Sequence, residues 1–148
     1  MAATATHIYS IKKLTPTLDG NAHQINVKLA AGQYLSGATL GEVTATPGTS
    51  ALYASGNSDG SQLAKYLLEY DTFVDSSGNH YRSDNGSVGS FGSGAELSAP
   101  VYYMGTFMTS DLPAFGSGAG SLDSAGLAAM NGHMVAGTLA AGGVIHIG

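Results

Sequence analysis

The chain contains no cysteine and no tryptophan, and it has few charged residues. Without cysteine, a disulfide framework and a thiolate-bound metal are both excluded. Asp, Glu, Lys and Arg together make up 10% of the 148 residues, against ~25% in typical domains. The surface must therefore expose much Ser, Thr, Gly and Ala, which can be buried against a neighbouring protein without removing water from ions. A small extracellular domain with a neutral surface would have the same composition.

The few charges are unevenly distributed along the chain. Residues 1–30 carry three Lys and one Asp, a net charge of +2, whereas the remaining residues carry a net charge of −7. Affinity for phosphate comes from clustered Lys and Arg, and the acidic part of the chain contains only Lys65 and Arg82. We therefore expect no nucleic acid as a partner.

Two stretches bear on a membrane location. The first six residues lack the basic start and the apolar run of a secretory signal. Residues 124–148 contain no charged residue, and the part from 126 to 145 reaches the ~20 residues that a membrane span needs. That part also contains Asn131, His133, Thr138 and five glycines, so we interpret it as protein core and expect no membrane partner.

Glycine, at 22 residues, indicates a fold of short strands joined by tight turns. We predict a β-rich α+β fold: a small single domain with one short helix near the C-terminus and an extended N-terminal arm. The helix is expected at 121–131, capped by Ser121 and ended by Asn131-Gly132. The strands are expected at 39–44, 51–53, 63–74, 100–108 and 142–147.

We divide the chain into an arm, residues 1–28, and a body, residues 29–148. Within the body, about residues 75–99 are rich in Gly and Ser and are expected to form a surface excursion with a hairpin turn at Asn85-Gly86. In the arm, residues 6–13 contain β-forming residues with apolar side chains on both faces, and Pro16 follows them. A partner would cover both faces, whereas the alternative is a disordered terminus. The candidate partner-binding residues are Ile8, Tyr9, Ile11, Lys12 and Lys13.

Patterns that carry catalysis or metal binding are missing. A Gly-x-Ser-x-Gly match at 56–60 falls in a dense cluster of turn residues and not in a strand-to-helix nucleophile elbow; no phosphate-binding loop occurs, and the five histidines lack metal-ligand spacing. Residues 75–79 (Asp-Ser-Ser-Gly-Asn) begin like a calcium loop but lack its sixth-position Gly and terminal Glu. We therefore predict that the protein is not an enzyme and has no cofactor or metal.

The order of motifs along the body resembles the lambda-type bacteriophage head decoration proteins. The motifs are Gly37-Ala-Thr-Leu-Gly-Glu-Val-Thr44, then Ser58-Asp-Gly-Ser-Gln62 before an apolar strand, then Val101 to Phe107, Leu127 to Asn131 and Gly143 to Ile145. The resemblance covers roughly residues 29–148, with gaps. The length of the arm and the Gly/Ser-rich stretch depart from the family pattern.

The resemblance implies a capsid-stabilising structural protein of the virion. Such a protein would form homotrimers on the outer surface of an expanded capsid, made in the host cytoplasm, and its arm would pair with the major capsid protein. One alternative is a fibre or baseplate module that binds host carbohydrate through tyrosines that stack on sugars: Tyr66, Tyr70, Tyr81, Tyr102 and Tyr103. A second is a secreted hydrolase, which is disfavoured because no set of nucleophile, base and acid stands out in the sequence.

Overall fold

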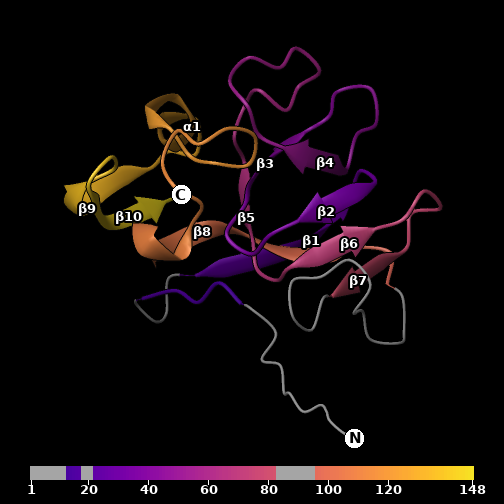
Figure 1. Ribbon diagram of the computed structural model, residues 1–148, viewed down its shortest axis with the longest axis horizontal. Coiled ribbons are helices and arrows are strands. Elements are labelled where there is room, and N and C mark those ends of the chain that lie inside the picture. Colours follow the sequence, from indigo (N-terminus) through magenta and orange to yellow (C-terminus); the bar gives the residue numbers. More distant parts are fainter. Residues whose placement is uncertain (1–12, 18–21, 83–95) are drawn as a thin grey trace, which may run out of the picture.

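The computed structural model describes residues 13–17, 22–82 and 96–148. Within these residues the chain forms ten strands, one 3-10 turn and one α-helix (Figure 1), which confirms the predicted β-rich α+β class with a single short helix near the C-terminus. The elements are β1 (His23–Leu29), β2 (Gly32–Tyr34), β3 (Thr39–Glu42), β4 (Thr49–Leu52), β5 (Tyr66–Leu68), β6 (Thr72–Val74), β7 (His80–Arg82), β8 (Ala99–Met108), η2 (Thr109–Asp111), α1 (Ser124–Ala129), β9 (His133–Thr138) and β10 (Gly142–Ile147).

Five of the strands close on themselves. The larger sheet has the order β1-β4-β3-β5-β8-β10-β9, and an additional pairing of β1 with β8 joins its first and fifth strands into a small barrel. β1 runs parallel to β4 and antiparallel to β8, with Ile25 opposite Val101. Closure removes the exposed edges that an open five-stranded sheet would have. A separate three-stranded sheet, β2-β6-β7, contains the remaining strands.

β8 links the barrel to a C-terminal extension. Its first half pairs with β1 and β5, while residues 105–108 pair with β10, which in turn pairs with β9. Gly105, where the partner changes, has φ 153°, a backbone conformation that favours glycine. The strand predicted at 100–108 is confirmed, and so is the last strand, β10.

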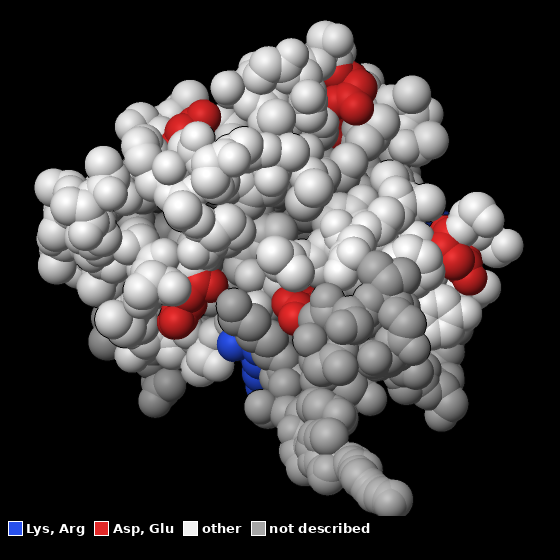
Figure 2. All heavy atoms as spheres, viewed as in Figure 1, with Lys and Arg blue, Asp and Glu red and all other residues white. Residues whose placement is uncertain are grey.

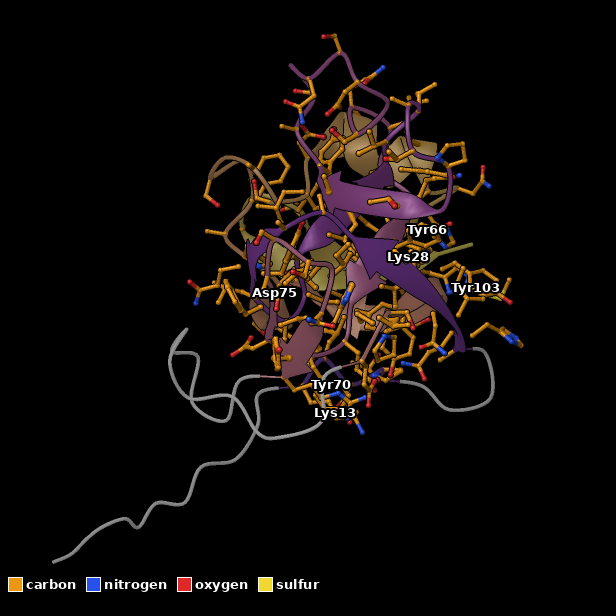
Figure 3. All side chains as sticks on the ribbon, turned by 90° about the vertical axis from the view of Figure 1, so that its right-hand side faces the viewer. Lys13, Lys28, Tyr66, Tyr70, Asp75 and Tyr103 are labelled. Carbon is orange, nitrogen blue, oxygen red and sulfur yellow. The ribbon has the colours of Figure 1, made fainter. Side chains whose placement is uncertain are left out.

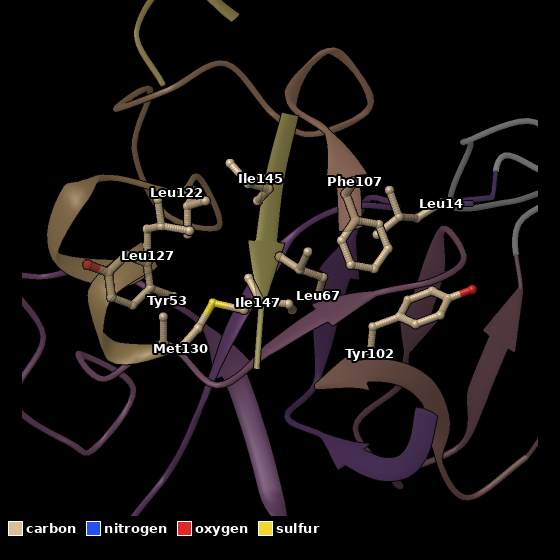
Figure 4. Close-up of a cluster of buried hydrophobic side chains, with 11 residues drawn as sticks. Leu14, Tyr53, Leu67, Tyr102, Phe107, Leu122, Leu127, Met130, Ile145 and Ile147 are labelled. Atoms are coloured by element: carbon tan, nitrogen blue, oxygen red, sulfur yellow. The ribbon is translucent and has the colours of Figure 1, made fainter. Parts of the chain in front are cut away.

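The core consists of two clusters of buried side chains. One lies in the barrel and includes Leu40, Leu68 and Val101. The other lies under α1 and β10 and includes Leu14, Phe107 and Ile145 (Figure 4). Tyr102 and Phe107 meet edge to face in this second cluster, with ring centroids 5.0 Å apart.

The helix begins three residues later than predicted. Its N-cap is Asp123, not Ser121: the Asp123 Oδ1 accepts the Gly126 N–H at 2.7 Å and the Tyr53 hydroxyl at 2.6 Å. Ser121 is already engaged, because its hydroxyl hydrogen-bonds the backbone of Gly118. The predicted end is confirmed: the helix stops after Ala129, with Met130 at the C-cap, and Asn131 then adopts φ 53°. Burial, and then the Asp123 carboxylate, raise the pKa of Tyr53 to about 12, so the phenol stays a donor.

Two further predictions, one of a strand and one of burial, need correction. The run at 63–74 is not one strand, because β5 belongs to the barrel and β6 to the small sheet, with the chain turning between them. Residues 133–138, predicted as core, form β9, whose side chains are mostly exposed. Lack of charge does not by itself indicate burial, since Gly, Ala and Thr also occur on surfaces. No helix among the described residues is long and apolar enough to cross a membrane.

The boundary predicted at residue 28 does not mark a structural break. Residues 23–29 form β1, a barrel strand, and Leu14 is buried in the core. Of the predicted excursion, Asp75–Asn79 form a turn and His80–Arg82 form β7, while Glu96 bridges back to His80. The Asn85-Gly86 turn lies outside the described residues.

Candidate partner-binding site at the arm root

Residues 13–17, here called the arm root, are fixed to the body by backbone and side-chain contacts. The Leu14 N–H donates to the Glu69 carbonyl at 2.7 Å, and the Thr17 N–H donates to the Thr106 carbonyl at 2.8 Å. The Leu14 side chain is 1% exposed and packs in the cluster that contains Phe107. The arm root is therefore an integral part of the fold.

Two cations meet the ring of Tyr70 at this root. The Lys13 ammonium lies 5.7 Å from the ring centroid and 3.7 Å from the Glu69 carboxylate, and the Arg82 guanidinium carbon lies 4.1 Å from the same centroid. Figure 3 shows Lys13 and Tyr70 side by side at one end of the molecule. Residues 13 and 82 adjoin the two longer ranges that the structure does not describe, 1–12 and 83–95. Both ranges thus connect to the body beside Tyr70.

Glu69 joins the arm root to the core. Its side chain is buried, and one carboxylate oxygen accepts the Tyr102 hydroxyl at 3.2 Å. Burial, and then the negative charge of Glu69, raise the pKa of Tyr102, so this phenol stays protonated. Lys13 supplies a positive charge beside Glu69, which lowers the cost of burying the carboxylate.

Of the five predicted arm residues, the structure describes Lys13 alone. Its side chain contacts Glu69 and Tyr70 of its own chain. Ile8, Tyr9, Ile11 and Lys12 lie outside the described residues. Sequence reasoning missed Glu69, Tyr70 and Arg82 as neighbours of Lys13, because only the folded chain brings these distant positions together.

Two of the motifs that carry the family resemblance, 37–44 and the turn at 58–62, contact each other. A side chain at Gly41, in β3, would begin 2.6 Å from the Leu63 carbonyl oxygen and 2.7 Å from the Ser61 backbone. In the turn at 58–62, Gly60 has φ 107°, and the Asp59 carboxylate accepts both the N–H and the hydroxyl of Ser61. These hydrogen bonds lower the pKa of Asp59. Gly41 is therefore required by the close approach of the turn.

Replacing Gly41 with Ala is expected to destabilise the fold by about 1–3 kcal/mol, because the added methyl group must displace backbone atoms. Gly56→Ala is the matched control. A Cβ there meets nothing within 4 Å, so its effect should stay within about 0.5 kcal/mol. Urea denaturation followed by circular dichroism measures both, and equal stability of the two variants would contradict the packing argument.

The candidate calcium loop is occupied by its own backbone. The Asp75 Oδ1 accepts the N–H groups of Ser77 and Asn79, both at 2.9 Å, and Oδ2 lies 3.2 Å from the Asn79 amide. These bonds lower the pKa of Asp75 and form a turn. Among the described residues, no group of three or more His, Cys, Asp or Glu could hold a metal ion.

His80 has a structural position. Its Nε2 accepts the Leu29 N–H at 2.9 Å, so the proton is on Nδ1, which donates to the Gly78 carbonyl at 3.0 Å. The ring thus joins the turn at 75–79 to β1 of the barrel. His133 and His146 instead lie together on the C-terminal sheet, with ring centroids 5.4 Å apart.

His80→Ala is expected to lower the free energy of unfolding by about 1–3 kcal/mol, because it leaves the buried Leu29 N–H without an acceptor. His133→Ala, at an exposed position, is the control and should be close to neutral. Thermal and urea unfolding of both variants tests this expectation, which fails if His80→Ala matches the wild type.

The five tyrosines considered for sugar binding do not form one site. Tyr102 is buried in the core, and Tyr70 lies at the arm root. Tyr66 and Tyr103 line a shallow hollow of about 520 Å³ together with apolar residues that include Ile25 and Met130. Tyr81 stacks on Phe73, with ring centroids 6.5 Å apart, so of the five rings only those of Tyr66 and Tyr103 line this hollow.

Comparisons with protein-family models, with curated proteins and with solved structures found no match. The functional argument therefore depends on the residues themselves and on their arrangement.

Charged groups are few and scattered over the surface. Figure 2 shows one face on which most of the described surface is uncharged. Of the described acids, Glu69 and Asp71 are buried, and Glu42 forms an ion pair with Lys65 at 2.6 Å. Little water bound to ions would have to be removed when such a surface is covered by another protein.

Proposed function

We propose that the chain is a structural virion protein that decorates and stabilises the outer surface of an expanded phage capsid. It binds the major capsid protein through its N-terminal arm, acts as a homotrimer and catalyses no reaction. The motif order that resembles head decoration proteins supports this proposal, as does the contact between its two best-defined motifs, at Gly41 and Ser61.

The observation that carries the proposal is the burial of Leu14. Residues 1–12 precede a residue that is anchored in the core, and they include Ile8, Tyr9 and Ile11 beside Lys12. A partner that binds these residues is therefore linked to the body through the anchored Leu14, with Lys13 alone between them. Any load on the arm passes to the Leu14 packing and to the Leu14–Glu69 hydrogen bond.

The physical basis is strand addition combined with multivalency. An extended arm that adds a strand to a shell protein gains main-chain hydrogen bonds, and its alternate side chains fill pockets. Three arms on one trimer raise the effective concentration of the second and third arms, which offsets the entropy lost when each arm is ordered. Tying neighbouring shell subunits together adds contact area that resists the outward pressure of packaged DNA.

Binding of the purified protein to empty expanded heads of its phage tests the proposal. Co-sedimentation with saturable stoichiometry is expected, with none on unexpanded heads. Mass measurement and imaging of the decorated particles should show clusters of three copies. Monomers spread evenly over the shell would contradict the trimer, and absence of binding would contradict the function.

A carbohydrate-binding virion module is the second candidate. The hollow that contains Tyr66, Tyr103 and Asn131 favours it, because aromatic rings and an amide are groups that contact sugars. Glycan-array binding that is lost in Tyr103→Ala, without head binding, would favour this candidate over capsid decoration.

A further inference from the structure

The C-terminal extension presents an exposed apolar row on its outer face. Residues directly opposite in neighbouring strands project to the same side of a sheet. Met108 in β8 is opposite Val144 in β10, which is opposite Ala136 in β9. Met108 and Ala136 are exposed, whereas the alternate residues Phe107 and Ile145 are buried in the core.

An apolar groove of about 470 Å³ adjoins this row. It is formed where the turn after β8 and the following loop approach the β9–β10 hairpin, and its lining includes Met108, Leu112, Pro113, Phe115 and Leu139. Met108 and Phe115 are 45% and 39% exposed. Exposed Met and Phe side chains are typical of the centre of a protein–protein interface.

Charge identifies what can cover this groove. None of the residues that line the groove is charged, although the exposed Asp111 adjoins it in η2. From residue 112 to 148 the only charged side chain is Asp123, whose carboxylate accepts hydrogen bonds from Tyr53 and Gly126. The whole chain carries a net charge of −5, so two copies repel each other through their acidic parts but not here. A basic partner would gain more by binding the acidic parts. The groove, whose lining is uncharged, is therefore suited to a second copy of this chain.

β9 supplies the matching projection. It is the last strand of its sheet, and among the described residues no strand pairs with its other edge. The register passes from Ala136 opposite Val144 to Met134 opposite Ile145, which leaves Val135 without an opposite residue at a β-bulge. Val135 is 53% exposed, and because the bulge interrupts the edge, side-chain packing is favoured here over a long ladder of backbone hydrogen bonds.

We propose that Val135 of one copy docks into the groove beside Met108 and Phe115 of a second copy. The β9 edge and the groove are different surfaces, so the contact is head to tail. In such an assembly every edge and every groove is occupied only when the copies close into a ring. The number of copies, three, rests on the proposed function, whereas the face and the partner come from the features above.

Engineered cysteines test the contact cleanly, because the natural chain contains none. In the full-length double variant Val135→Cys/Met108→Cys, mild oxidation should link the chains into closed trimers, both on heads and in concentrated solution. A bond within one chain is excluded, because β10 separates the two strands by ~10 Å, beyond the ~7 Å limit for a disulfide. Each single-cysteine variant should stay unlinked, and so should the control Leu35→Cys/Met108→Cys, since Leu35 is 55% exposed but does not line the groove or belong to β9.

The outcomes separate the two proposals. Heads that bind the protein but yield no linked chains overturn the contact and leave decoration standing. Linked trimers without head binding support the contact and contradict decoration. Linkage in the Val135→Cys single variant would show a symmetric edge-to-edge dimer and overturn the head-to-tail arrangement. As an independent measure, Val135→Lys should abolish self-association in native mass spectrometry, whereas Leu35→Lys should not change it.

Discussion

Deleting residues 2–12 is expected to abolish binding to expanded heads while leaving the body folded. The deletion removes Ile8, Tyr9 and Ile11, the side chains proposed to bury against the capsid protein, but stops before the buried Leu14. Far-UV circular dichroism and urea unfolding should match the full chain, and co-sedimentation with heads should be lost. If the shortened chain decorates heads as tightly as the full chain, the arm is not the anchor.

Two substitutions separate backbone from side-chain binding in the arm. Ile8→Pro removes a hydrogen-bond donor and blocks strand addition, so it should weaken head binding severely. Tyr9→Ala should weaken the free energy of head binding by about 1–3 kcal/mol if the ring is buried at the centre of the interface. Titration of heads with each variant measures both effects. A small effect of Ile8→Pro beside a large effect of Tyr9→Ala would indicate side-chain docking without an added strand.

The sequence predicted those elements whose signals are local. A continuous apolar run marks β8, and Asn131-Gly132 marks the end of the helix. The predicted start of the helix was wrong because two residues that can cap a helix, Ser121 and Asp123, lie close together. The Ser121 hydroxyl hydrogen-bonds Gly118, so Asp123 caps the helix instead. Which of the two residues caps the helix depends on the conformation of the loop, and local sequence propensity does not predict that conformation.

Features that depend on distant contacts could not be predicted. Closure of the barrel needs β1 to pair with both β4 and β8, and sequence patterns do not specify partners. The same reason explains why residues 22–28 were assigned to the arm and why the Lys13–Glu69–Tyr70 contacts were missed. For the arm itself the sequence named its candidate residues, and the structure adds where the arm joins the body.

Replacing Leu14 with Ala is expected to lower the free energy of unfolding by about 2–5 kcal/mol, which is a large part of the stability of a small domain. Leu14 is 1% exposed in the cluster with Phe107, and truncating it leaves a cavity next to residues that cannot fully collapse. Leu35→Ala is the matched control, because the same side chain is removed at a 55% exposed position; its effect should stay within about 0.5 kcal/mol.

Measuring both stability and head binding of Leu14→Ala tests whether Leu14 anchors the arm to the core. If Leu14 transmits load from the arm to the core, heads decorated with Leu14→Ala should be less resistant to heat than heads decorated with the wild type. This loss should appear even at temperatures where the free variant is still folded. The arm residues themselves are unchanged in this variant, so its initial head binding should stay close to that of the wild type. A Leu14→Ala protein as stable as Leu35→Ala would show that the arm root is not part of the core, and the proposed anchoring would then be wrong.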